Sequence, residues 1–234
     1  MFRIRAFRTT QDRESCEKFA FGHEKVLRDF GVEKVTSANK SWMDNPDVYV
    51  LIVESLDGEV VYGGSRIHKR NAEFPLPVED AVGEMDPQIY EMVQGDETYG
   101  AGEMCGLWNS KDARGTGIST VLTKATVAKA GVEIANLLGI KRLWVLCAPY
   151  TVGMVEEAGF RIIKSLGDQG TFPYPRPDLP ATILRLDDAD QLPTATDGNR
   201  TDIFDLRNKP VQKKVEIGPK GEIIVEYDLM IKNL

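Results

Sequence analysis

The sequence predicts a mixed α/β fold, and three features carry that prediction. Residues 2–7 alternate apolar and basic side chains, which is typical of a strand. Two β-rich runs within residues 47–70 flank Asp57-Gly58, a strong hairpin turn signal. A glycine-rich stretch, residues 111–119, separates a strand-like run from a long helical pattern. Strands and helices share the chain without regular alternation, which favours a mixed α/β protein over an all-β or a regular βαβ one.

The N-terminal half is expected to form a helix, the hairpin and an irregular connection. Residues 11–31 carry apolar side chains at helical spacing, and Gly31 is placed to end that helix. Gly63-Gly64, in the second hairpin strand, indicates a bulge or a close backbone approach. Residues 74–93 predict a connection with one or two short helices.

The C-terminal half continues with further strands and helices. The glycine-rich stretch, with a strand before it and a helix and a strand after it, predicts a βαβ crossover. Beyond residue 187 the chain becomes polar and rich in turn residues. Strands are predicted at 101–110, 141–148 (buried on both faces), 160–167 and 181–186. Helices are predicted at 117–138 and 150–160, with Gly139 and Gly159 as their stop signals. A second hairpin is predicted at 211–231, with its tip at 218–221.

Composition narrows the class of protein. The 234 residues predict one domain, or one domain with an extension, and a net charge of −7 argues against a general nucleic-acid binder. Three scattered cysteines and two histidines give no disulfide framework and no metal-binding spacing. No apolar run reaches the roughly 20 residues of a membrane span, and the N-terminus lacks a signal core. We therefore expect a cytoplasmic protein with no metal and with no nucleic acid or membrane as its partner.

The stretch from Arg114 to Ser119 is suited to hold an anion. A helix N-terminus presents unpaired N–H groups and a partial positive charge, and glycines allow a ligand to approach the backbone closely. Arg114 adds a fixed positive charge. The alternative is a tight turn whose glycines serve only the chain geometry. No Gly-Lys-Ser/Thr ending follows, and the third glycine of the dinucleotide fingerprint is missing, so a nucleotide-binding α/β domain is disfavoured.

This stretch resembles the acyl-CoA pyrophosphate loop of the GNAT N-acyltransferase superfamily. The family pattern is Gln or Arg, two residues, Gly, one residue, then Gly or Ala; Arg114 and Gly117 match it, and Ser119 replaces the last small residue. The order of elements around the loop is also similar, over roughly residues 1–187. The resemblance implies a central mixed, mostly antiparallel twisted sheet flanked by helices. Residues 188–234 would be a C-terminal extension whose β-hairpin packs on the same domain or on a partner subunit in a homodimer.

The resemblance also implies a donor site for acetyl-CoA or another acyl-CoA. Amides of the loop would hold the pyrophosphate, and the splayed end of the preceding strand would take the pantetheine through backbone groups. The residues implied to contact the donor are Leu107, Trp108, Asn109, Arg114, Gly115, Thr116, Gly117, Ile118 and Ser119.

The N-terminal half further resembles acyl-homoserine-lactone synthases, a GNAT branch that takes acyl chains from acyl carrier protein. The shared features are a hairpin ending in Gly-x-x-Arg, here Gly63 to Arg66, and a long insertion before a strand that carries a glutamate. Coenzyme A and acyl carrier protein both stay open as donors. Arg66 and His68 lie two apart on one strand, so they share a face that would border the acceptor; a solvated His68 is the alternative.

Glu103 is the predicted general base. Amine acylation needs a neutral nitrogen, and several family members place a catalytic glutamate at the matching point of this strand. Partial burial near an acyl channel would raise its pKa, whereas a solvated strand-end glutamate is the alternative interpretation. Cys105 is expected to face away from Glu103, and Cys147 is expected to be a packed small hydrophobe.

A general acid is harder to place. The positions of the family's tyrosine and asparagine are occupied by Val155 and Ala148, and Tyr150 lies nearby in a different register. Either Tyr150 substitutes, or the thiolate leaves unassisted, or catalysis is weakened or lost. The predicted function is therefore an acyltransferase, autoinducer-synthase-like or N-acetyltransferase-like, acting on the amine of a small molecule by direct attack in a ternary complex. A non-catalytic acyl-thioester-binding or regulatory protein is the alternative.

Overall fold

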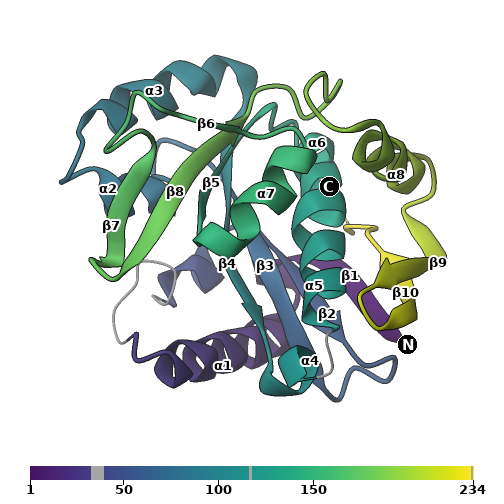
Figure 1. Cartoon of the computed structure of the whole chain (residues 1–234). Coiled ribbons are helices and arrows are strands. Elements are labelled where there is room, and N and C mark those ends of the chain that lie inside the picture. The colour runs from purple at the N-terminus through teal and green to yellow at the C-terminus, as the bar shows by residue number, and fades with distance from the viewer. Residues whose placement is uncertain (33–39, 116–117, 233) are drawn as a thin grey trace.

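One mixed β-sheet forms the centre of the molecule. The computed structural model describes residues 1–32, 40–115, 118–232 and 234, and within them ten strands join one sheet in the order β6-β8-β5-β4-β3-β2-β1-β10-β9, with β7 paired to β8 (Figure 1). Neighbouring strands are antiparallel except β4–β5 and β1–β10, which are parallel. The strands are β1 (Phe2–Arg8), β2 (Val48–Glu54), β3 (Val61–Lys69), β4 (Ala101–Asn109), β5 (Arg142–Cys147), β6 (Arg161–Ile162), β7 (Thr171–Arg176), β8 (Leu179–Leu186), β9 (Val211–Gly218) and β10 (Gly221–Asp228).

Helices cover both faces of this sheet (Figure 1). In the described ranges, none of them is long and apolar enough to cross a membrane. The α-helices are α1 (Arg13–Asp29), α2 (Pro77–Val82), α3 (Gln88–Asp96), α4 (Lys111–Gly115), α5 (Ser119–Thr123), α6 (Gly131–Leu137), α7 (Pro149–Glu157) and α8 (Asp197–Asn208). The π-helix η5 (Lys124–Ala130) joins α5 to α6, and 3-10 turns are η1 (Thr9–Gln11), η3 (Ser41–Asp44) and η4 (Glu97–Tyr99).

The two sheet faces have separate cores because side chains alternate along each strand. In β2, which is buried throughout, Leu51 and Val53 pack with α5, η5 and α6, whereas Val50 and Ile52 pack with α1. A third core forms where α2 and α3 cover Trp144 of β5. The sheet is therefore the middle layer of three, and a side chain on β3 or β4 faces either the α5–α6 layer or the layer of α1 and α2.

Local chemistry explains several of the correctly predicted elements. Asp12 caps α1 by accepting the Ser15 N–H at 3.0 Å, and Gly31, with φ of 65°, follows its C-terminal end. Gly58, with φ of 75°, lies in the turn between β2 and β3, as the Asp-Gly pair predicts. The N-terminal helix and both hairpins are confirmed.

The glycine pair in β3 is also confirmed as a close backbone approach. A Cβ on Gly63 would lie 2.3 Å from the carbonyl oxygen of Trp108, and one on Gly64 would lie 2.1 Å from that of Leu51. Gly64 has a φ of 152°, which side chains rarely adopt. Both neighbouring strands therefore approach β3 more closely than any larger residue permits.

Gly64→Ala is expected to lower the free energy of unfolding by about 2–4 kcal/mol, from backbone strain and overpacking together. The matched control is Gly95→Ala in α3, where nothing lies within 4 Å of the added methyl group. That control should be neutral or stabilising by up to about 1 kcal/mol. Urea unfolding of the two variants measures both effects, and equal stabilities would contradict this account of β3.

The strands β4 and β5 separate halfway along β4. Their parallel pairing runs from Ala101 to Met104 of β4 and ends there, opposite Val145, although β4 continues to Asn109. On its other edge, β4 shifts register against β3 between Arg66↔Cys105 and Gly64↔Trp108, so two β4 residues oppose one on β3. This bulge lies where β4 leaves β5, and beyond Met104 the backbone of β4 is no longer paired with β5.

Several elements differ from the predictions. The helix predicted at 117–138 is formed by α5, η5 and α6 in succession. Residues 111–115, expected to be part of a turn, form the short helix α4, whose start is capped because Ser110 Oγ accepts the Ala113 N–H at 3.2 Å. Strand β7 went unpredicted because it contains two prolines, which argue against a strand. Helix α8 lies within the stretch interpreted as turns, since only Asn199, Ile203 and Leu206 of its residues are buried. Of the strand predicted at 160–167, only β6 forms.

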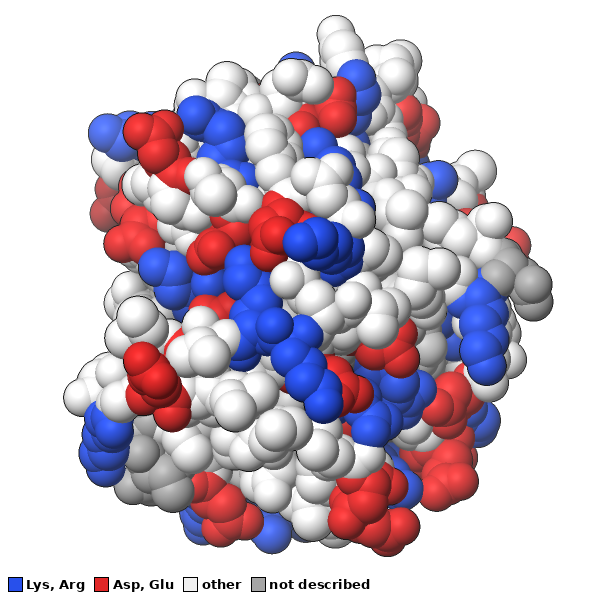
Figure 2. Space-filling view, turned by 90° about the vertical axis from the view of Figure 1, so that its right-hand side faces the viewer, with Lys and Arg blue, Asp and Glu red and all other residues white. Residues whose placement is uncertain are grey.

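The C-terminal hairpin extends the sheet, because β10 pairs in parallel with β1 from Phe2↔Val225 to Arg5↔Asp228. Figure 2 shows the side of the molecule that carries this hairpin, where acidic and basic side chains are interspersed. Ion pairs account for part of this mixing, as Glu226 lies 3.5 Å from Arg3 and 3.3 Å from Lys213. Beneath the hairpin, the buried Lys129 of η5 forms ion pairs with the partly exposed Asp202 at 2.7 Å and with the buried Glu216 at 2.6 Å.

Candidate functional site

Strands β3 and β4 bring Glu103, Arg66 and His68 together on one sheet face. His68 is directly opposite Glu103, and Arg66 is directly opposite Cys105, so all four side chains point to the layer of α1 and α2. Glu103 is 2% exposed, Arg66 1% and His68 6%. The expected orientation of Cys105 is wrong, because residues two apart on a strand share a face. Arg66 Nη2 donates to Cys105 Sγ at 3.8 Å.

Glu103 is buried under the start of α2. Its Oε2 accepts the backbone N–H of Val78, the second residue of that helix, at 2.6 Å. Burial raises the pKa of Glu103 to about 8, although the Val78 N–H and the charge of Arg66 oppose the rise. The interpretation of Glu103 as a solvated strand-end residue is therefore wrong. A carboxyl group that ionises near neutral pH is suited to accept a proton from an amine.

Arg66 supplies a buried positive charge beside Glu103. Its guanidinium lies 4.3 Å from the ring centroid of Trp42 and 5.9 Å from that of Phe19. Its effect extends to both histidines: burial first, and the charge of Arg66 second, lower the pKa of His68 well below its usual range and that of His23 to about 3. His68 is therefore a neutral imidazole at physiological pH, and the interpretation of it as a solvated strand residue is wrong.

A cavity of about 140 Å³ opens beside Arg66 and His68. Arg66 and His68 form polar parts of its wall, Trp42 and Phe74 form apolar parts, and Asp80 of α2 also lines it. No pattern in the sequence singles out Phe74 or Asp80. The available signal was Pro77, which occupies the first position of α2 and so fixes where this helix begins beside the cavity.

The residues predicted to bind the donor on β4 lie where this strand leaves β5. Trp108 packs edge-on against Phe19, with ring centroids 5.8 Å apart, and Asn109 Nδ2 donates to Thr123 Oγ1 at 2.8 Å. Leu107 is half-buried against the core of the α5–α6 layer. The side chains of Trp108 and Asn109 thus serve packing, and the backbone of this segment is the part suited to meet a ligand.

The predicted phosphate loop is described only at its two ends. Gly115 ends α4, Ile118 is the N-cap residue of α5, Ser119 begins α5, and Thr116 and Gly117 lie outside the described residues.

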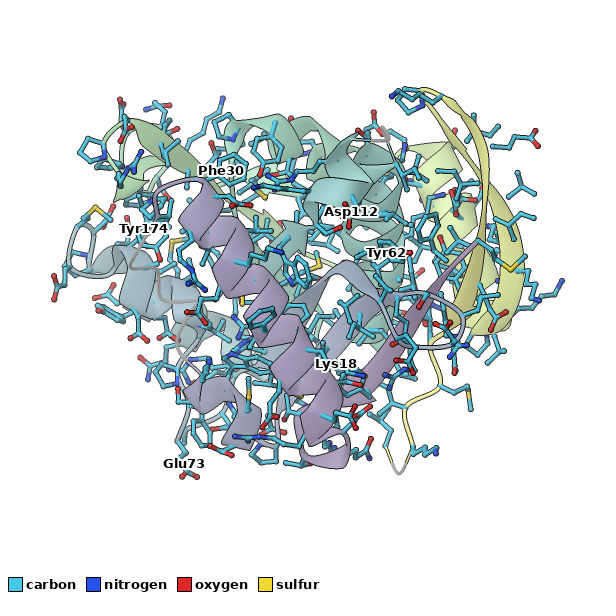
Figure 3. All side chains as sticks on the ribbon, turned by 90° about the horizontal axis from the view of Figure 1, so that it is seen from below. Lys18, Phe30, Tyr62, Glu73, Asp112 and Tyr174 are labelled. Atoms are coloured by element: carbon cyan, nitrogen blue, oxygen red, sulfur yellow. The ribbon has the colours of Figure 1, made fainter. Side chains whose placement is uncertain are left out.

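Arg114 forms an ion pair with an acidic neighbour, Asp29. Arg114 Nη2 lies 3.5 Å from Asp29 Oδ2, and Lys111 Nζ lies 3.0 Å from Asp29 Oδ1. The guanidinium also lies 5.0 Å from the ring of Phe30, which Figure 3 shows at the end of α1. An anion bound at Arg114 would compete with Asp29.

Tyr150 is set apart from Glu103. It is 82% exposed in the first turn of α7, a helix that packs into the core on the other sheet face through Val155. Val155 is fully buried at the position where the family carries a tyrosine. Cys147 is a packed small hydrophobe, as predicted, and burial raises the pKa of its thiol, like that of Cys105, to about 12.

The sheet order, the separation of β4 from β5 and the helices on both faces define the GNAT-type acyltransferase fold, as predicted. Among solved structures, the chain is similar to FeeM, an N-acyl amino acid synthase from uncultured soil microbes. The TM-score is 0.58 at 15% identity, covering 84% of this chain and 96% of that one. It is also similar to BjaI, a CoA-dependent acyl-homoserine lactone synthase, solved with MTA. Here the TM-score is 0.54 at 15% identity, over 90% and 91% of the two chains.

At this level of identity the likeness concerns the fold alone, and it is the fold that the sequence predicted. No protein-family model matches the sequence, and no curated protein sequence matches it.

Proposed function

We infer that the protein is an N-acyltransferase that moves an acyl group from a thioester donor to the amine of a small molecule. The observation that carries this proposal is Glu103, a fully buried carboxyl with its pKa raised to about 8. It lies directly opposite His68, which lines the cavity, and on the strand that leaves β5 a few residues later. Burial is the largest cause of this shift, and strongly shifted carboxyl groups cluster at functional sites.

The chemistry follows from these positions. The neutral amine attacks the thioester carbonyl, forming the C–N bond, and the C–S bond breaks as the tetrahedral intermediate collapses. Glu103, as carboxylate, accepts the proton that the amine nitrogen loses, and the leaving thiolate takes a proton from water or from Tyr150. Tyr150 stays a proposal, because it is exposed and its helix packs on the other sheet face.

The donor is proposed to lie along the second half of β4. Backbone groups of Leu107, Trp108 and Asn109 would meet the pantetheine arm, and residues 114–119 would meet the phosphates of an acyl-CoA. A donor carried by acyl carrier protein would use the same strand. Residues 1–187 would form the acyltransferase unit, and the C-terminal extension would support it.

A second candidate function is acyl-thioester binding without catalysis. It is favoured by the apolar Val155 and Ala148 at the positions of the family's tyrosine and asparagine, and by the exposure of Tyr150. Free-thiol release in the presence of amines separates the two functions, because a binding protein would hold the donor without consuming it.

Thermal unfolding with ligands tests the donor site. A ligand that binds only the native state raises the melting temperature, and at 100 times its Kd it adds about 2.7 kcal/mol of stability. Coenzyme A is expected to raise the melting temperature, and ATP and NAD at equal concentration are not. A shift with NAD or ATP but none with coenzyme A or with acyl carrier protein would overturn the proposal.

The rate of acyl transfer is expected to rise with pH up to a plateau above pH 8. Glu103 must be ionised to accept a proton, and its pKa of about 8 means that it is mostly protonated below that pH. The value of kcat/KM, corrected for ionisation of the acceptor amine, should therefore fall about tenfold for each pH unit below the pKa. A flat profile between pH 6 and 9 would exclude Glu103 as the base.

A further inference from the structure

We propose that β9 is a dimerisation surface, which pairs in antiparallel fashion with β9 of a second copy of this chain. The two sheets then become one across a two-fold axis that passes through Val215. This inference goes beyond the proposed function and does not depend on it.

Strand β9 is an open edge of the sheet. It lies at the rim of the molecule (Figure 1), and among the described residues it pairs with β10 alone, from Val211 to Gly218. In an antiparallel ladder only alternate residues bond to the neighbouring strand, so the other residues of β9 direct their N–H and C=O groups outward. The opposite end of the sheet is blunted, since β6 has two residues and β7 contains Pro173 and Pro175. With eight residues and no proline, β9 is a template for another strand.

The two lysines of β9 have acidic partners within their own chain. Lysines on an edge strand commonly keep other chains away. Here, however, Lys213 Nζ lies 3.3 Å from a carboxylate oxygen of Glu226 on β10. Lys214 Nζ lies 3.0 Å from Asp202 and 2.9 Å from Asp205, both on α8. Their charges are thus compensated and do not protect the edge.

Aliphatic side chains become more exposed toward this edge. Val215 and Ile224 are directly opposite each other on the outer face of the hairpin, and they are 54% and 41% exposed. Ile217, on the same face of β9, is 81% exposed. Cross-strand neighbours cover side chains from the side, and β9 has such neighbours on one side only. A second strand beside β9 would therefore cover the most exposed of these aliphatic groups.

Charge selects the register of this pairing. Directly opposite residues of antiparallel strands share a face, so a two-fold axis passes through a residue of β9, and an axis near either end would pair only a short segment. In the middle of β9, an axis at Lys213, Lys214 or Glu216 places like charges directly opposite each other, which is destabilising. An axis at Val215 brings two valines together and places Lys214 opposite Glu216 of the partner subunit.

The test is sedimentation equilibrium of the full chain from about 1 μM to 1 mM, the range of moderate to weak association. We expect a reversible monomer–dimer equilibrium. Val215→Lys, which brings like charges together at the axis, should raise the dimer Kd at least about tenfold. Ile224→Lys makes the same change on the same face one strand inward, and it should leave the Kd nearly unchanged. A monomer throughout this range, assemblies larger than a dimer, or equal effects of the two substitutions would overturn the proposal.

Cysteine substitutions test the register under mild oxidation. Val215→Cys should give a disulfide-linked dimer, because Cα atoms of opposite residues lie about 4.5–5.5 Å apart, within the reach of a disulfide. The two copies of residue 217 would be about 14 Å apart along the strands, so Ile217→Cys should stay unlinked. The wild type is the control for the three native cysteines, of which Cys16 and Cys147 are buried. Any other pattern of linking would overturn the proposal.

Discussion

Glu103→Gln lowers the rate of acyl transfer by about 10²–10⁴-fold, the range expected when a general base is lost. The amide keeps the shape of the side chain, and its oxygen still accepts the Val78 N–H that Glu103 accepts at 2.6 Å. It cannot take a proton from the acceptor amine, so the effect should appear in kcat while the melting-temperature shift with coenzyme A is retained. The acid limb of the pH profile should disappear in this variant.

The same substitution should raise stability at alkaline pH. The pKa of Glu103 is about 8 in the folded protein and close to 4.5 when the chain is unfolded. Between these values the folded state holds a proton that the unfolded state releases, so the contribution of Glu103 to stability falls as pH rises from 4.5 to 8. The amide introduced by Glu103→Gln does not ionise, and at pH 9 the variant should therefore melt above the wild type.

Glu91→Gln is the matched control, because it makes the same change of side chain at an exposed residue of α3 that does not line the cavity. It should leave acyl transfer and melting nearly unchanged. If Glu103→Gln retains wild-type kcat, Glu103 is not the base. If it melts below the wild type at pH 9, the buried carboxyl serves the fold rather than the chemistry.

Lys129→Met lowers the free energy of unfolding by about 3–5 kcal/mol, the cost of breaking a buried ion pair from one side. Lys129 Nζ lies between Glu216 Oε2, at 2.6 Å, and Asp202 Oδ2, at 2.7 Å. Tyr227 donates to the other oxygen of Glu216 at 2.6 Å. Methionine matches the volume of the lysine stem but leaves Glu216 buried without its cation. Urea unfolding at pH 7 measures the loss.

Lys124→Met, in the same π-helix, is the control for the lysine substitution. Lys124 pairs with Glu157 at 3.0 Å, with both side chains about half exposed, and such a pair contributes less than about 1 kcal/mol. Adding Glu216→Gln to Lys129→Met should recover part of the lost stability, because the unpaired buried charge is then removed. Equal losses for Lys129→Met and Lys124→Met would contradict the role assigned to the buried pairs.

The sequence was sufficient for elements whose signals are local. The caps of α1, the Asp-Gly turn between β2 and β3, and the continuous apolar run of β5 all follow from neighbouring residues. Glu103 and Arg66 were found through the family resemblance, Glu103 as the glutamate on the strand before residues 114–119 and Arg66 as the end of the Gly-x-x-Arg pattern.

The remaining features depend on contacts between distant segments. Helix α8 has few apolar residues, so its pattern is not recognisable as a helix. It is held instead by ion pairs of Asp202 with Lys129 and of Arg207 with Glu133, about 70 positions earlier in the chain. The pairing of Arg114 with Asp29 and the position of Asp80 beside the cavity likewise arise from tertiary packing. Cys105 was misplaced by an error in applying strand alternation, which the sequence alone would have corrected.

The most direct test of acyl transfer is to incubate the protein with an acyl-CoA series from acetyl to long chain, each with a panel of small amines that includes L-amino acids. Free thiol is followed with time, and products are identified by mass spectrometry. We expect thiol release that requires an amine, an N-acylated product in equal amount, and the loss of both in Glu103→Gln. Binding of the donor with no amine-dependent release and no N-acylated product, from coenzyme A or from acyl carrier protein, would contradict the assignment as an acyltransferase.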